Sequence, residues 1–135
     1  MNRIPNGKTS REGTSLNTNT VGPKRGEVWV VNFDPTIGAE IKKSRPAVVV
    51  SSDAVGRLPI KLIAPITDWK QVFGQNLWHI QIQPDQANGL SKISAVDTLQ
   101  LRGVDTQRFV RNLGRVSAVV MQEIAAAIAA VVEYQ

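Results

Sequence analysis

The chain has 135 residues, with 16 Lys and Arg against 11 Asp and Glu, and it contains no Cys. This length fits one domain with a single hydrophobic core. The absence of Cys excludes disulfide bonds and thiolate-ligated metals, and a single His, His79, excludes two-histidine catalysis within one chain. The formal net charge of +5 favours a polyanionic partner such as RNA or DNA, although a solvated basic surface has the same composition.

The longest apolar run covers residues 124–132, which is shorter than the roughly 18 apolar residues that a membrane span needs. The N-terminal residues lack an apolar stretch of the signal-peptide type. We therefore expect a cytoplasmic protein with no membrane attachment. Residues 1–23 are rich in Asn, Thr, Ser and Gly, so we expect a flexible polar tail before a folded domain at 24–135.

Short apolar runs bounded by turn residues predict a series of strands. The first covers residues 28–33, and a long polar loop at 34–45 follows because Asp34 and Pro35 break the strand. A near-continuous apolar run at 47–51 predicts a strand that is buried on both faces. Further strands are expected at 60–66, 77–82, 94–101 and 109–116, with single helical turns at 53–57 and 105–108.

Only the C-terminal segment has helical periodicity. Ser117 can cap a helix that runs to about residue 133, and Val120, Ile124, Ile128 and Val131 follow helical spacing. Because this helix carries few charges, we expect it to pack on the sheet and to contact a second subunit. Several short strands followed by one helix predict a mainly β (α+β) fold, a small curled antiparallel sheet or barrel with a helical cap.

Six segments occur in a specific order: KRGEVW at 24–29, FDPTIGAE at 33–40, RPAVVVS at 45–51, APIT at 64–67, LQLR at 99–102 and LGRVS at 113–117. Together they resemble the MazF/PemK family of toxin endoribonucleases from bacterial toxin–antitoxin systems, over about residues 24–133. The resemblance implies an SH3-like barrel of the CcdB/MazF type that works as a homodimer. It also implies cleavage of single-stranded RNA (mRNA) at short sequences, without metal or cofactor, and a cognate antitoxin that occupies the RNA groove. An acidic antitoxin would suit the basic surface.

The resemblance implies that Arg45 and Thr67 form the catalytic pair. RNA can be cleaved by its own 2′-OH when a base, an acid and charge stabilisation at phosphorus are present. An Arg beside a hydroxyl donor supplies the stabilisation, because guanidinium groups match phosphate oxygens. Arg is a poor base. Glu40 matches an acidic loop residue that some relatives use, and His79 is the one side chain that titrates near neutral pH, so the identity of the base stays open.

Candidate RNA-binding residues lie around this pair. Lys42 and Lys43 flank Arg45 and would attract phosphates without reading the base sequence. The other candidates are Ser52, His79, Gln100 and Arg102. A second basic group could serve the groove or the dimer and comprises Arg102, Arg108, Arg111 and Arg115. Trp29 could stack on a base, although a position in the core or at an interface also accounts for it.

Two departures from the family pattern keep other functions open. Some relatives have an Arg and an Asp two residues apart in the fifth strand, where this chain has Asp97 and Leu99. Some have a His before the loop Arg, where this chain has Ser44. One alternative is therefore a catalytically weak relative that only binds nucleic acid or an antitoxin. A second is a CcdB-like topoisomerase inhibitor, which would need no phosphate-binding side chain such as Arg45.

Overall fold

The computed structural model describes residues 22–134, so residues 1–21 of the predicted tail and Gln135 lie outside the described part. Seven strands and one helix follow in chain order: β1 (Glu27–Asn32), β2 (Ser44–Val49), β3 (Ile60–Asp68), β4 (His79–Ile82), β5 (Ser94–Asp97), β6 (Arg102–Asp105), β7 (Phe109–Arg115) and α1 (Ala118–Val131). Four 3₁₀ turns connect them: η2 (Asp53–Val55), η3 (Gln71–Gln75), η4 (Thr98–Gln100) and η5 (Thr106–Arg108). No helix among the described residues is long and apolar enough to cross a membrane.

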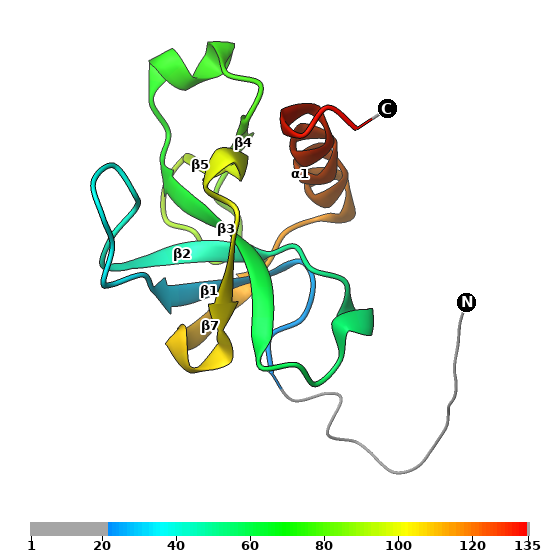
Figure 1. The fold of residues 1–135 in the computed structure, drawn as a ribbon. Coiled ribbons are helices and arrows are strands. Elements are labelled where there is room, and N and C mark those ends of the chain that lie inside the picture. The colour runs from blue at the N-terminus through cyan, green and yellow to red at the C-terminus, as the bar shows by residue number, and fades with distance from the viewer. Residues whose placement is uncertain (1–21, 135) are drawn as a thin grey trace.

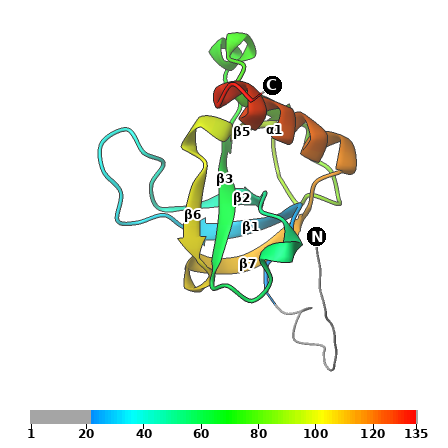
Figure 2. The same ribbon diagram turned by 45° about the vertical axis from the view of Figure 1, so that its right-hand side comes forward.

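All strand pairs are antiparallel, and the sheet has the order β4-β5-β3-β2-β1-β7, with β6 paired to β3 (Figures 1 and 2). This confirms the predicted small antiparallel sheet with a C-terminal helix. Within residues 22–134 no pairing joins β6 to β7, so hydrogen bonds do not close the sheet into a complete barrel. The predicted strand at 94–101 was too long, because the Asp97 side chain caps η4 and ends β5 there.

The central strands are buried on both faces, as the apolar run in β2 predicts. Val48 belongs to one apolar cluster, whereas its neighbours Ala47 and Val49 belong to another, because successive side chains of a strand point to opposite faces. The first cluster also contains Val28, Ala64, Ile66, Ile82, Val96 and Ile124. The second also contains Val31, Phe33, Ile63 and Val104. A slip of one residue would exchange the two sets, so burial fixes the strand register.

Helix α1 packs beside β4 and η4 (Figure 1) and covers the first cluster. Ser117 caps it as predicted, since its Oγ accepts a hydrogen bond from the Val120 N–H at 3.1 Å. Ile124 is fully buried, and Met121 and Ala127 are buried next to the predicted apolar stripe. Helix packing thus confirms the periodicity that the sequence shows.

The loop after β4 approaches β7 closely, because two residues at the contact are glycines. A Cβ on Gly114 would lie 2.0 Å from the carbonyl oxygen of Ala87, and a Cβ on Gly89 would lie 2.1 Å from that of Leu113. Gly114 also has a φ of +153°, which favours glycine. The Arg115 N–H donates to the Ala87 carbonyl at 2.8 Å. This close approach places the segment that follows, residues 90–92, beside the ends of β2 and β3.

We expect Gly114→Ala to lower the free energy of unfolding by about 2 kcal/mol or more, because the new methyl group collides with a backbone carbonyl. Gly74→Ala is the matched control, since its Cβ would meet its nearest neighbour, a Trp69 ring carbon, at an ordinary 3.9 Å. Urea titration measures both variants. Equal stabilities for the two variants would contradict the close packing.

Candidate active site

Arg45 and Thr67 come together at the ends of two neighbouring strands. Arg45 is the second residue of β2, where it pairs with Val31. The observed loop is therefore slightly shorter than the predicted one. The β2–β3 register places Ala47 opposite Pro65, and its continuation by two residues places Arg45 opposite Thr67. Both side chains line a groove of about 200 Å³, which we call the Arg45 groove. Arg45 is exposed and Thr67 is half-buried, so both can reach a ligand in solution.

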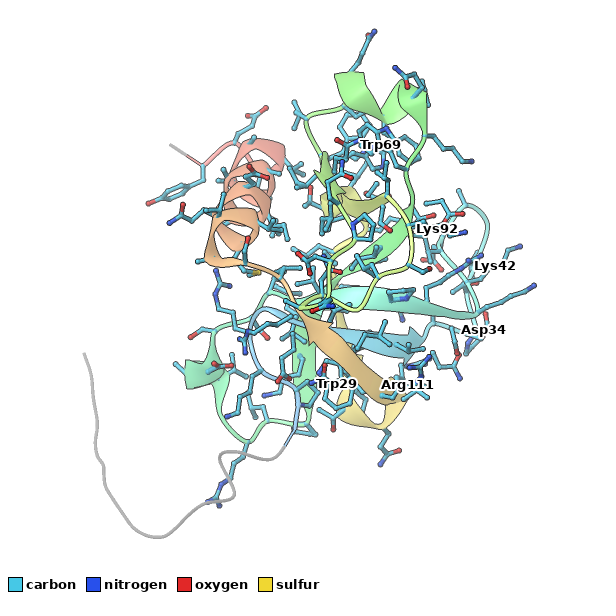
Figure 3. All side chains as sticks on the ribbon, turned by 180° about the vertical axis from the view of Figure 1, so that it is seen from behind. Trp29, Asp34, Lys42, Trp69, Lys92 and Arg111 are labelled. Carbon is cyan, nitrogen blue, oxygen red and sulfur yellow. The ribbon has the colours of Figure 1, made fainter. Side chains whose placement is uncertain are left out.

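The Arg45 groove is also lined by residues 90–92, which follow the close approach at Gly89 and Gly114. Leu90, Ser91 and Lys92 line it, together with Asp68 of β3. Lys92 Nζ lies 3.2 Å from Asp68 Oδ2, and both side chains are exposed. Figure 3 shows Lys92 and Lys42 on the same side of the molecule. No local pattern in the sequence singles out Lys92, because its place depends on the close approach of two backbone segments at Gly89 and Gly114.

A second cavity, of about 430 Å³, opens under the β1–β2 loop (residues 33–43), and we call it the loop pocket. Three predicted site residues line it: Glu40, Gln100 and Arg102. The Arg102 guanidinium lies over the Phe33 ring, 5.6 Å from its centroid. Pro65 also lines the loop pocket, and the next two residues of β3 line the Arg45 groove. The two cavities are therefore neighbours along one strand.

Glu40 lines the loop pocket and is not among the residues that line the Arg45 groove. Its Oε1 accepts a hydrogen bond from the Ile37 N–H at 2.7 Å, and its own N–H donates to the Ile37 carbonyl. Glu40 is exposed, so the carboxylate stays accessible to solvent while it shapes the tip of the loop. A catalytic role for Glu40 stays a prediction.

The two basic groups differ in how their charges are used. Lys42 and Lys43 are exposed on the β1–β2 loop, as expected for groups that attract phosphates. Arg108, in contrast, donates to the Asn32 carbonyl at 3.1 Å and to the Asp34 carbonyl at 2.6 Å. Arg115 of the same group similarly donates to the Arg25 carbonyl at 2.9 Å. Part of the second group thus stabilises the backbone around β1.

The structure does not bring Ser52 or Trp29 to the Arg45 groove. Ser52 follows the opposite end of β2, where its Oγ accepts from the Ala54 N–H and caps η2. The Trp29 ring is half-buried against the second apolar cluster and meets Phe109 edge-on at 5.7 Å. Its Nε1 donates to Glu27 Oε1 at 2.9 Å. Core packing therefore accounts for Trp29, and a base contact by Ser52 stays a prediction.

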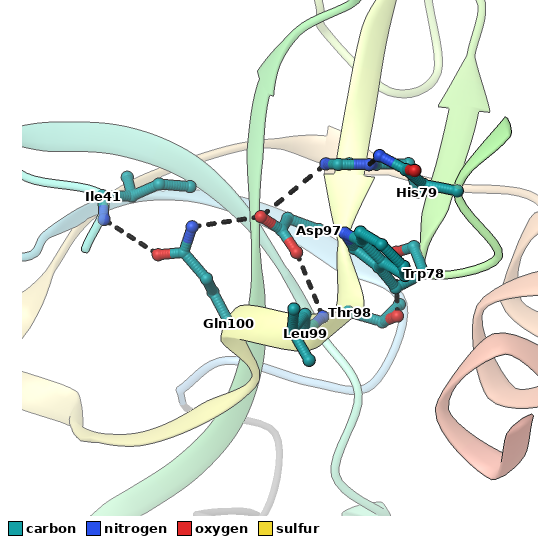
Figure 4. Close-up of polar contacts among 8 residues, drawn as sticks. Ile41, Trp78, His79, Asp97, Thr98, Leu99 and Gln100 are labelled. Carbon is teal, nitrogen blue, oxygen red and sulfur yellow. Dashed lines mark hydrogen bonds and ion pairs between the residues drawn. The ribbon is translucent and has the colours of Figure 1, made fainter. Parts of the chain in front are cut away.

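His79 was expected on the polar face of its strand, but only 7% of its side chain is exposed. Its ring stacks on Phe73 with centroids 3.9 Å apart, and Nδ1 lies 3.2 Å from the Asn76 amide nitrogen. Nε2 lies 3.7 Å from Asp97 Oδ2 (Figure 4). Burial lowers the pKa of His79 below its ordinary 6.5, and the Asp97 carboxylate opposes this shift only in part. Periodicity missed this burial because η3 folds over the strand.

No cluster of three His, Asp or Glu side chains suited to a metal ion occurs among residues 22–134. The Arg45 groove offers two cationic side chains, Arg45 and Lys92, and the hydroxyl groups of Thr67, Ser91 and Ser94, with Asp68 paired to Lys92. This donor set suits a phosphate, whose oxygens accept hydrogen bonds and carry negative charge.

The sequence and the fold both match known toxins. Residues 24–132 match the family model of PemK-like, MazF-like toxins of type II toxin–antitoxin systems. Endoribonuclease MazF9 of Mycobacterium tuberculosis (strain ATCC 25618 / H37Rv) is 31% identical over 113 residues, which cover 75% of this chain and 88% of that protein. The chain therefore belongs to the PemK/MazF toxin family, and the resemblance that the sequence shows is confirmed.

Solved structures agree on the fold. The crystal structure of MazF from Deinococcus radiodurans superimposes with a TM-score of 0.70 at 23% identity, covering 84% of this chain and 98% of that one. A mycobacterial endoribonuclease in complex with its cognate antitoxin gives a TM-score of 0.67 at 16% identity, with coverage of 84% and 98%. At these identities the comparison shows a common architecture.

The lowered pKa of His79 predicts a pH-dependent stability. Below pH 6.5 the unfolded chain takes up a proton at His79 that the folded chain does not yet bind. The free energy of unfolding should therefore fall as the pH is lowered from above 6.5 to the pKa of the folded state. Urea titrations from about pH 8 to pH 5 should show this decrease, and His79→Gln should lack it. A wild-type free energy of unfolding that rises as the pH is lowered over this range would contradict the assignment.

Proposed function

We propose that this protein is the toxin of a type II toxin–antitoxin system and an endoribonuclease that cleaves single-stranded mRNA in the cytoplasm without a metal ion. The main support is that Arg45 and Thr67 line one accessible groove at the ends of β2 and β3. Membership of the PemK/MazF family supports the same conclusion.

In the proposed reaction, the 2′-oxygen of the substrate attacks the adjacent phosphorus and loses its proton to a base. The P–O5′ bond breaks, and an acid protonates the departing 5′-oxygen. Arg45 binds the nonbridging oxygens and stabilises the charge that grows on them, while the Thr67 hydroxyl donates to one of them. Lys92, which lines the same groove beside Asp68, adds positive charge near the same phosphate.

RNA affinity and sequence choice would come from different groups. Lys42 and Lys43 attract the phosphate backbone regardless of sequence. The loop pocket adjoins the groove and is lined by a group that can accept hydrogen bonds from a base edge, the Glu40 carboxylate. Arg102 adds a planar cation on which a base can stack. We therefore place sequence selectivity at the loop pocket, next to the bond that is cleaved.

We further propose a homodimer and an acidic antitoxin. The outer side of α1 and the residues after it leave large apolar side chains exposed, with Val119 at 63% and Val132 at 66%. A second copy of the chain would cover them. The exposed basic residues of the loop suit an acidic segment that occupies the RNA site.

The experiment mixes purified protein with a long single-stranded RNA in excess EDTA and resolves the products by sequencing their ends. We expect cuts at discrete positions, with 2′,3′-cyclic phosphate and 5′-hydroxyl termini. Arg45→Ala should reduce the cleavage rate by roughly 100-fold or more, because it removes the charge stabilisation at phosphorus. Thr67→Val, which keeps the side-chain shape, should slow cleavage to a smaller extent.

Arg57→Ala is the matched control, because Arg57 is an exposed arginine in the turn before β3, whereas Thr67 lies near the far end of that strand. It should cleave RNA like the wild type. RNA that stays intact with the wild type but is bound by it would support a non-catalytic relative instead. Equal cleavage by Arg45→Ala and the wild type would refute the Arg-centred mechanism.

A further inference from the structure

We propose that Asp97 and Gln100 are positioning residues that hold the β1–β2 loop against the sheet and so fix how RNA lies relative to Arg45. The expected effect on cleavage rests on the proposed function. The contacts themselves do not depend on it, and they can be tested separately.

Two hydrogen bonds link the end of β5 to the loop through Gln100, and a third holds the Asp97 carboxylate in place (Figure 4). Asp97 Oδ1 accepts from the Leu99 N–H at 3.0 Å, and Asp97 Oδ2 accepts from Gln100 Nε2 at 3.0 Å. Gln100 Oε1 accepts in turn from the backbone N–H of Ile41 at 2.8 Å, across 59 positions of sequence. The chain of contacts thus runs from a strand end, through one amide side chain, to the loop backbone.

The Asp97 carboxylate determines which way the Gln100 amide points. A carboxylate only accepts hydrogen bonds and a backbone N–H only donates them. Gln100 can therefore join Asp97 to Ile41 in one orientation, with Nε2 toward the carboxylate and Oε1 toward the loop. Without the charge, the amide could turn over and present a donor to the Ile41 N–H, which would leave that N–H without an acceptor.

Asp97 is itself held firmly by the sheet. It is 7% exposed, and β5 pairs with β3 on one side and β4 on the other. Its Oδ1 caps η4, so that the carboxylate cannot rotate without losing the cap. Hydrogen bonds to a charged acceptor are roughly twice as strong as neutral ones. Asp97 thus provides a fixed anchor for Gln100.

Ile41 is a point at which the middle of the loop joins the sheet. Two other loop hydrogen bonds stay within the loop, from the Ile37 N–H to Glu40 and from the Lys43 N–H to Asp34. The Ile41 side chain packs against the second apolar cluster, next to its N–H contact with Gln100. Ile41 lies directly between Glu40 and Lys42, so its anchor places both of these loop residues.

The first test uses Asp97→Asn, which keeps the shape and removes the charge. The amide at position 97 has one acceptor oxygen in place of two. It can accept a hydrogen bond from the Leu99 N–H or from Gln100 Nε2 in its present orientation, but it cannot do both. We expect a roughly tenfold lower kcat/KM for RNA, mainly through a higher KM, because the chemical groups at Arg45 and Thr67 are unchanged. Gln100→Glu should have a similar effect, because it places two carboxylates against each other.

The double variant Asp97→Asn/Gln100→Glu should restore much of the lost KM. The amide at position 97 can then donate to the carboxylate at position 100, whose other oxygen still accepts from the Ile41 N–H. A merely destabilising role would make the double variant worse than either single variant. Asp105→Asn is the matched control, because Asp105 also caps a 3₁₀ turn but its side chain is exposed and bonds to Gln107.

The second readout is amide hydrogen exchange at Ile41, which needs no RNA. We expect faster exchange at Ile41 in both single variants, and wild-type exchange in the double variant and in Asp105→Asn. Unchanged exchange in the single variants, or no recovery in the double variant, would overturn the proposal. If the exchange follows this pattern while wild-type protein leaves RNA intact, the proposed function fails and the loop anchor stands.

Discussion

Strand β3 makes the contacts on which the rest of the molecule depends. Its first residues pair with β6, its middle with β2 and its last residues with β5. Its successive side chains Ile63 and Ala64 are buried in different apolar clusters, so a shift of one residue would disrupt both cores. Core packing therefore determines the position of Thr67 relative to Arg45, and this position does not depend on a flexible segment. The geometry of an active site at strand ends is thus determined by packing in the interior of the protein.

Much of the fold could be predicted because its signals are local. The apolar run of β2, the break at Pro35 and the Ser117 cap each depend on a few neighbouring residues. Arg45 and Thr67 could be assigned because the family resemblance marks their positions, although neither is distinctive by itself. What periodicity could not give was the end of β5, where the Asp97 side chain takes the hydrogen bond that would otherwise continue the strand.

The parts of the site that escaped prediction depend on long-range contacts. Lys92 reaches the Arg45 groove because Gly89 and Gly114 let two backbone segments approach each other closely. His79 has the alternation of a surface residue, yet the Phe73 ring of η3 covers it. Such burial comes from a connection folding back over its strand, and alternation within one strand carries no information about it.

The basic residues near the β1–β2 loop differ in what their side chains contact. Arg108 binds backbone carbonyls near the base of the β1–β2 loop, whereas Lys42 and Lys43 stay exposed on the loop itself. Adjacent lysines repel each other and would favour an extended, solvated loop. A neutral amide, Gln100, opposes this by binding the loop backbone without adding charge of either sign. The loop can therefore keep its positive surface for a polyanion while its path is determined by a buried carboxylate on the opposite side of that amide.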